Sequence, residues 1–185
     1  MSFIANTAFL PRMWNNRNDD LQNIPGLFGA VSEGEFVPAD CSAGFACVKG
    51  KHLPGGGYQM TAAADGSTDI YFCNQGDVQR VPFGGDKLFA VGVETLGLGA
   101  PAGELCTYTK AIPGETYAFG PGDFTTLVDA TTNKYAVIQN GLLKGQAAAP
   151  ESGIYFQLDE GLGIDTWTEA NYGAFARYNL LCCKA

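Results

Sequence analysis

Residues 135–143 read YAVIQNGLL, and this stretch contains the strand–turn–strand pattern that is expected to recur along the chain. Its first five residues are rich in aromatic and β-branched side chains, which favour a strand. Asn140-Gly141 is a dipeptide favoured in two-residue hairpin turns, and Leu142-Leu143 begins the returning strand. The stretch therefore predicts a β-hairpin.

The same kind of pattern recurs in the first half of the chain. Asp65-Gly66 is a second hairpin dipeptide, and it separates predicted strands at residues 58–61 and 68–73. Residues 34–37 and 44–49 read as another pair of strands. We expect each of these two pairs to form a hairpin of its own.

Strand signals continue to the end of the chain, whereas helical periodicity is nearly absent. Two short helical turns are predicted, one at residues 18–23 and one at residues 167–172 with Thr166 as its cap. Roughly ten short strands at this spacing are typical of sandwiches and barrels. The predicted fold class is all-β, with a short-stranded sandwich- or barrel-like body. The remaining strands are expected at residues 87–93, 104–110, 116–119, 124–128, 154–158 and 175–183.

Composition narrows the class of protein further. The chain has 185 residues, of which 46% are hydrophobic and 12% aromatic, so it can bury a sizeable core. Its net charge is −8, and its 11 basic residues form no cluster, which argues against nucleic acid and anionic membranes as partners. We expect no signal peptide and no membrane-spanning helix, and synthesis in the cytoplasm.

The first 28 residues differ from the rest and read as an extended arm that precedes the body. Residues 2–10 are small and apolar, and residues 11–20 are dense in side chains that compete for backbone hydrogen bonds. A turn is expected over residues 24–28, where the arm ends. An arm of this kind has to lie on something, either its own body or a neighbouring subunit.

The domain organisation that we expect has three parts. The arm occupies residues 1–28, a small β module follows at 29–81, and a larger β sandwich or barrel fills 82–185. The boundary is placed at residues 81–86, which are rich in turn formers. The alternative is that the two β modules form one continuous domain.

No catalytic constellation, cofactor motif or metal site is recognised in the sequence. His52 is the only histidine, which excludes sites that need two or three imidazoles, and no nucleophile motif accompanies it. We interpret it as an exposed loop residue. Acidic pairs such as Asp65 with Asp69 and Asp159 with Glu160 lie in predicted turns, where solvated carboxylates are common. A hydrolase that uses His52 or a carboxylate pair is kept as a hypothesis, ranked third after the two binding functions given below.

The six cysteines are expected to be buried thiols that act as small apolar residues, because no export signal accompanies them. Cys182 and Cys183 would point to opposite faces of one strand. Disulfides formed after release into an oxidising environment remain an open alternative. The cysteines are Cys41, Cys47, Cys73, Cys106, Cys182 and Cys183.

The arm and the first strands together resemble capsid-associated structural proteins of tailed bacteriophages, of the decoration or cement type. The resemblance lies in residues 9–17 (FLPRMWNNR), the Pro25-Gly26-Leu27-Phe28 segment and the entry Gly34-Glu35-Phe36-Val37. It covers about the first 50 residues and carries no diagnostic motif. It implies a place on the capsid and, often, a trimeric assembly.

We therefore expect a non-enzymatic virion structural protein that docks on the capsid through its arm. Its expected partners are the major capsid protein and further copies of itself, most simply as a homotrimer. Each large apolar side chain of the arm could contribute about 1.5–3 kcal/mol if fully buried. The alternative is a β-sandwich module that binds a ligand or a glycan. The residues expected to make the interaction are Phe9, Leu10, Met13, Trp14 and Arg17.

Overall fold

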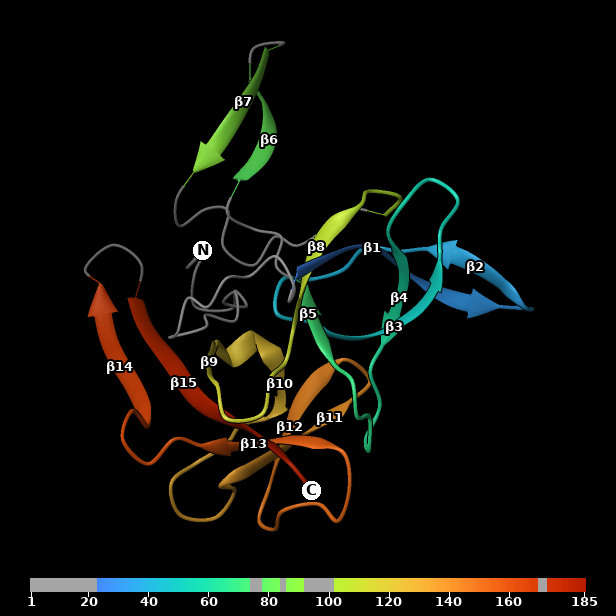
Figure 1. Cartoon of the computed structure of the whole chain (residues 1–185). Helices are drawn as coiled ribbons and strands as arrows, with labels where there is room; N and C mark the ends of the chain where they lie inside the picture. The colour runs from blue at the N-terminus through green and yellow to red at the C-terminus, as the bar shows by residue number, and fades with distance from the viewer. Residues whose placement is uncertain (1–22, 74–77, 84–85, 92–101, 170–172) are drawn as a thin grey trace.

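The computed structural model confirms an all-β body, and it describes residues 23–73, 78–83, 86–91, 102–169 and 173–185. The strands form a six-stranded sheet, a seven-stranded sheet and a two-stranded ribbon (Figure 1). The ribbon pairs β6 (Val78–Phe83) with β7 (Asp86–Val91). Whether residues 1–22 form an arm lies outside the described residues.

The first sheet closes into a small barrel. Strand β1 pairs in parallel with β4 through residues 26–28 and antiparallel with β8 through residues 23–26, which completes the ring β1-β4-β3-β5-β8. Gly26 makes this closure possible, because a Cβ there would press on the side chains of Met60 and Tyr108 inside the barrel. The strands are β1 (Asn23–Ser32), β2 (Glu35–Pro38), β3 (Ala46–His52), β4 (Tyr58–Ala62), β5 (Tyr71–Cys73) and β8 (Cys106–Lys110).

The second sheet is an open half-barrel, drawn in yellow to red in Figure 1. Its order is β10-β12-β11-β13-β15, and the long strand β15 then pairs with β14 along one part of its length and with β9 along another. A short 3₁₀ turn, Pro121–Asp123, follows β9. The strands are β9 (Thr116–Phe119), β10 (Phe124–Thr126), β11 (Tyr135–Gln139), β12 (Leu142–Gln146), β13 (Ile154–Leu158), β14 (Ile164–Glu169) and β15 (Gly173–Lys184).

The two sheets share one of the two hydrophobic cores. Phe72 projects from the barrel wall, and its ring lies 5.3 Å from that of Phe119 and 5.7 Å from that of Phe156, both in the half-barrel. The second core lies inside the barrel and contains Met60 and Tyr108. The division of the body at residues 81 and 82 stays a prediction, although β8, beyond that boundary, completes the barrel.

The predicted hairpin at Asn140-Gly141 is confirmed. Gln139 pairs with Leu142, and both turn residues have positive φ angles, 50° for Asn140 and 82° for Gly141. These are the backbone angles that a tight two-residue turn between twisted strands requires.

Two of the predicted strand pairings in the first half are wrong. The strand at Glu35–Pro38 pairs with β1 and not with the strand at Ala46–His52. The Asp65-Gly66 turn is present, but β4 and β5 do not pair across it, because both lie beside β3, one on each side. A turn signal cannot anticipate this arrangement, since β3, which precedes both strands in the chain, lies between β4 and β5 in the sheet.

Two further local predictions are also wrong. Residues 24–28 form part of β1 and not a turn, because backbone pairing on both sides holds this segment extended. Residues 164–169 form strand β14 and not a capped helical turn, since Thr166-Trp167-Thr168 pairs with β15 and its residue types favour a strand. The other predicted helical turn, residues 18–23, lies mostly outside the described residues, and Asn23 begins β1.

Candidate interaction site

None of the residues expected to make the interaction lies within the described part of the chain. The structure does describe the point from which they depart, which is the start of β1. Its first residue, Asn23, accepts a 2.7 Å hydrogen bond from the hydroxyl of the buried Thr109 in β8. Residues 1–22 are therefore joined to a strand that is fixed in a closed barrel. The residues in question are Phe9, Leu10, Met13, Trp14 and Arg17.

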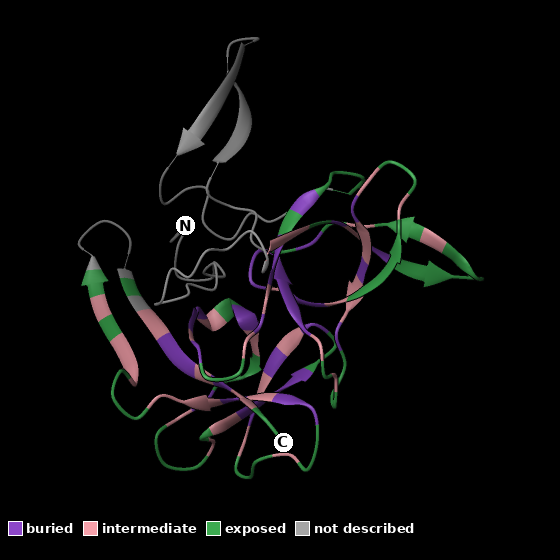
Figure 2. Cartoon of the chain, in the orientation of Figure 1, coloured by how far each residue is buried: buried purple, intermediate pink, exposed green. Residues whose placement is uncertain are grey.

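The other end of β1 carries an exposed apolar hairpin. Beyond the barrel, Gly29–Ser32 pairs with β2, and the hairpin projects from the body (Figure 1). Val31 is 63% exposed and Val37 is 50% exposed, and nearly all of β2 is coloured as exposed in Figure 2. The tip turns through Glu33 and Gly34, which have φ angles of 51° and 85°. We call residues 29–38 the β1–β2 hairpin.

One strand thus connects the segment that is expected to make the interaction with an exposed apolar hairpin. Residues 23–28 pair with β4 and β8, so they form a rigid base for the residues that precede them and for the β1–β2 hairpin that follows them. Large apolar side chains that stay in water are unfavourable unless a partner covers them. The β1–β2 hairpin is the part of the described structure where two exposed valines lie on one projecting element.

A groove of about 360 Å³ lies along the β14–β15 ribbon. Small side chains of both strands form most of its lining, and Pro121 and the half-buried Trp167 contribute to it as well. The groove is lined by Pro121, Thr166, Trp167, Thr168, Ala174 and Ala176. Because side chains alternate along a strand, Thr166, Thr168, Ala174 and Ala176 share the face of the ribbon that lines the groove, whereas the ring of Trp167 lies on the other face.

An ion pair lies on the face of the same ribbon that carries the Trp167 ring. Arg177 donates two hydrogen bonds to one carboxylate oxygen of Asp165, at 3.1 Å from Nε and 2.6 Å from an Nη atom. Its guanidinium group also lies 5.9 Å from the ring centroid of Trp167. The Arg177 hydrogen bond, followed by that of Asn179, lowers the pKa of Asp165. The carboxylate is thus charged and held in place at neutral pH.

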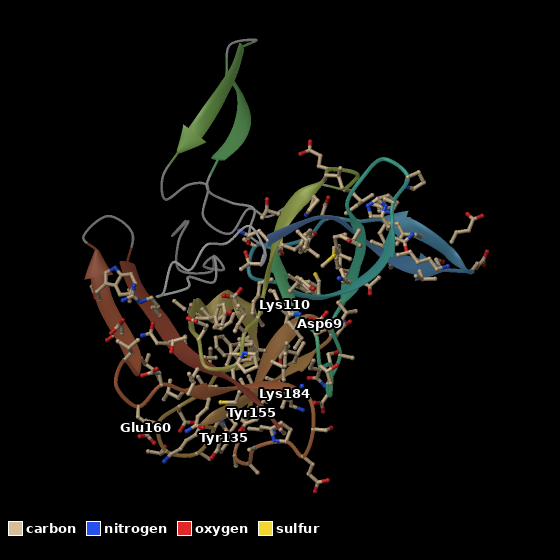
Figure 3. The ribbon with its side chains drawn as sticks, viewed as in Figure 1. Asp69, Lys110, Tyr135, Tyr155, Glu160 and Lys184 are labelled. Atoms are coloured by element: carbon tan, nitrogen blue, oxygen red, sulfur yellow. The ribbon has the colours of Figure 1, made fainter. Side chains whose placement is uncertain are left out.

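One group of barrel residues combines lysines with tyrosine rings. The ammonium group of Lys49 lies 5.0 Å from the ring centroid of Tyr58, and His52 packs edge-on against the same ring at 5.2 Å. Lys110 forms a 2.7 Å ion pair with Asp69, which is labelled with it in Figure 3. The Asp69 hydrogen bond raises the pKa of Lys110. These pairs are largely exposed, where such contacts contribute little to stability.

The sequence-based view of His52 needs one correction, while that of the cysteines is supported. His52 is exposed as expected, but it ends strand β3 and does not lie in a loop. All six cysteines are thiols, and five of them are buried. Cys182 faces the shared core while Cys183 is partly exposed, which confirms that they point to opposite faces. Among the described residues, no group of three or more His, Cys, Asp or Glu side chains could hold a metal ion.

Comparison with known proteins gave no match to a protein-family model, to a curated protein or to a solved structure. Within the part of the chain that the structure describes, no helix is long and apolar enough to cross a membrane. The groove and the exposed hairpin were both missed by sequence reasoning. Trp167 was assigned to a helical turn, and residues 34–37 were paired with the wrong strand, so neither feature had the right surroundings.

Proposed function

We propose that this chain is a structural protein of a bacteriophage head, which attaches to the capsid through residues preceding β1. Its role would be that of a decoration, cement or minor head protein, and it would act by binding and not by catalysis. The expected partners are the major capsid protein and further copies of the chain. It would be made in the host cytoplasm and would reside in the virion.

The observation that supports this proposal most directly is the construction of β1. Residues 23–28 close the barrel, the segment with the apolar residues Phe9, Leu10 and Trp14 precedes them, and an exposed apolar hairpin follows them. A rigid strand with an apolar element on each side is well suited to bridge two subunits. The all-β body agrees with this role without being specific for it.

Self-association is the second part of the proposal. Strand β2 pairs only with β1 within the described sheets, so its other edge is open to a partner. Symmetric assembly is the usual form for soluble oligomers, and the preference for a trimer rests on the family resemblance alone. The net charge of −8 opposes association of separate subunits, so association should strengthen with salt.

The test of self-association uses the exposed valines. We expect Val31→Ser combined with Val37→Ser to shift the protein from trimer to monomer in multi-angle light scattering, at both low and high salt. Leu162→Ser is the matched control, since Leu162 is an apolar residue, 43% exposed, in the turn between β13 and β14 of the other sheet. A wild-type protein that stays monomeric at high concentration and high salt would contradict this part of the proposal.

The second candidate function is a ligand- or glycan-binding module, and the groove beside Trp167 favours it. The half-buried indole ring of Trp167 can stack on a sugar ring, and the groove on the other face of the same ribbon carries the hydroxyls of Thr166 and Thr168. Binding on a glycan array with better than millimolar affinity, lost in Trp167→Ala, would support this candidate. Electron microscopy that shows the chain repeated on a capsid lattice would support the structural role.

A further inference from the structure

Four of the six cysteines gather inside the barrel, around one buried tyrosine. Each is at most 5% exposed, and Tyr108 is fully buried among them. They come from four different segments of the chain: one precedes β3, and the others lie in β3, β5 and β8. The cluster consists of Cys41, Cys47, Cys73 and Cys106.

The strand register explains why these side chains meet. Cys73 pairs directly with Tyr108, and Cys106 pairs with Gly26, which leaves space inside the barrel because it has no side chain. Cys47 pairs with Tyr71, which lies two residues before Cys73 and so faces the same side of β5. The closed ring therefore directs the side chains of all three strands toward a common interior.

Cys41 lies at the centre of the cluster. Its side chain packs in one cluster with Cys47, Cys73 and Tyr108, and its thiol donates a 3.7 Å hydrogen bond to the carbonyl of Ser42. The Tyr108 hydroxyl makes no hydrogen bond of good geometry, although it is fully buried. A buried hydroxyl surrounded by sulfur atoms is poorly satisfied, because thiols are weak hydrogen-bond partners.

Two of the thiols, those of Cys41 and Cys106, are protonated at neutral pH. The hydrogen bond with Cys47, together with burial, raises the pKa of Cys41. Burial, with Cys73 and Glu104 nearby, raises the pKa of Cys106 to about 12. Because the thiolate is the attacking species, reaction at neutral pH is slow and depends on local opening of the segment before β3.

We propose that Cys41 and Cys47 form a disulfide when the protein passes from a reducing cytoplasm to a medium that contains a low-molecular-weight disulfide. One protein thiol loses its proton and attacks a sulfur of the oxidant, which releases one small thiol and leaves a mixed disulfide. The second protein thiol then loses its proton and attacks that mixed disulfide, releasing a second small thiol. The two cysteines lose two electrons and two protons, and the oxidant gains them.

Cys47 is the expected partner of Cys41 for two reasons. Cys41 and Cys47 are the two cysteines of the cluster that lie nearest in the chain, six residues apart, so the loop that their link closes is short. Cys41 also lies in the connection before β3, outside the longer strands, whereas Cys73 lies in β5, which pairs with β3 and β8. The link would fasten this connection to the barrel wall.

Peptide mapping tests the proposal on the unmodified chain. The purified protein is incubated with oxidised glutathione or with dithiothreitol, unfolded, alkylated and cut with trypsin. Trypsin separates the cysteines into residues 18–49, 52–80, 88–110 and 178–184, so Cys41 and Cys47 share one peptide. We expect peptide 18–49 to lose two hydrogen atoms and both alkylation sites after glutathione treatment only.

Every other result would overturn the proposal. These results are a link from peptide 18–49 to peptide 52–80, a glutathione adduct that persists, full alkylation after prolonged exposure, or one zinc ion per chain in the purified protein. Cys41→Ala should abolish the mass loss, and Cys183→Ala, outside the cluster, should leave it unchanged. The wild-type map decides the question even if Cys41→Ala fails to fold.

Discussion

Gly141, at the tip of the β11–β12 hairpin, lies directly against the ring of Phe45 in the segment leading to β3. A Cβ at position 141 would overlap that ring, so only glycine fits. The backbone of Gly141 also joins the two sheets: its amide donates to Ala63 at 2.8 Å, and its carbonyl accepts from Ala46 at 2.8 Å. The hairpin turn of one sheet is therefore part of the contact with the other.

We predict that Gly141→Ala destabilises the protein strongly. A φ of +82° costs an alanine about 1–2 kcal/mol, and the overlap with Phe45 adds about 1–3 kcal/mol. Gly114→Ala is the matched control, because Gly114 has a φ of +92° with no atom within 4 Å of the added Cβ. Urea unfolding should give a clearly larger loss for Gly141→Ala, and equal losses would show that the contact with Phe45 contributes nothing.

The Gly141 turn also shows how far sequence could lead. The hairpin itself follows from Asn140-Gly141, because the turn chemistry is local. Its contact with Phe45 does not, since the two residues lie almost a hundred positions apart and no local pattern links them. The same holds for β1: Ile24-Pro25-Gly26 reads as a turn, and only pairing with β4 and β8 makes it a strand.

The candidate site was also predictable only in part. Apolar side chains before β1 were recognised from composition, whereas the exposed valines of the β1–β2 hairpin depend on which strand pairs with β2. Trp167 was visible as one of two tryptophans, but the groove beside it forms only when β14 lies against β15. Features that arise from pairing between distant strands could not be predicted from the sequence, whereas features set by neighbouring residues could.

Acid should weaken one loop of the half-barrel in a defined way. The backbone amide of Thr132 and the hydroxyl and amide of Thr131 donate to the Asp129 carboxylate and hold its pKa at about 2. In the unfolded chain an aspartate has a pKa of about 3.9. The stabilisation is therefore complete above pH 4 and is lost as the pH falls through 2.

Asp129→Asn should accordingly be less stable than the wild type at pH 7, and the difference should shrink toward pH 2. Urea midpoints at pH 7, 4 and 2.5 measure this, with Asp65→Asn in an exposed turn of the other sheet as the control. A difference that stays constant across this range would mean that the Asp129 charge is not the cause.

Truncation should separate the segment before β1 from the barrel. Deletion of residues 2–22 leaves β1 complete, so we expect the shortened protein to keep the β-type circular dichroism spectrum and cooperative unfolding. Deletion of residues 2–28 removes the part of β1 that pairs with β4 and β8, which opens the barrel and exposes its core. The longer deletion should give insoluble or protease-sensitive protein, and a stable product would contradict the closure of the barrel by β1.

The most direct test of the proposed function is capsid binding by the protein that lacks residues 2–22. Under the proposal the gene belongs to a bacteriophage, so purified full-length and shortened proteins are mixed with capsids of that phage, and bound copies are counted after sedimentation. We predict stoichiometric binding of the full-length protein and at least about tenfold weaker binding of the shortened one, since losing even one buried anchor costs about 1.5 kcal/mol or more. Equal binding by the two proteins, or no binding by the full-length one, would contradict this account.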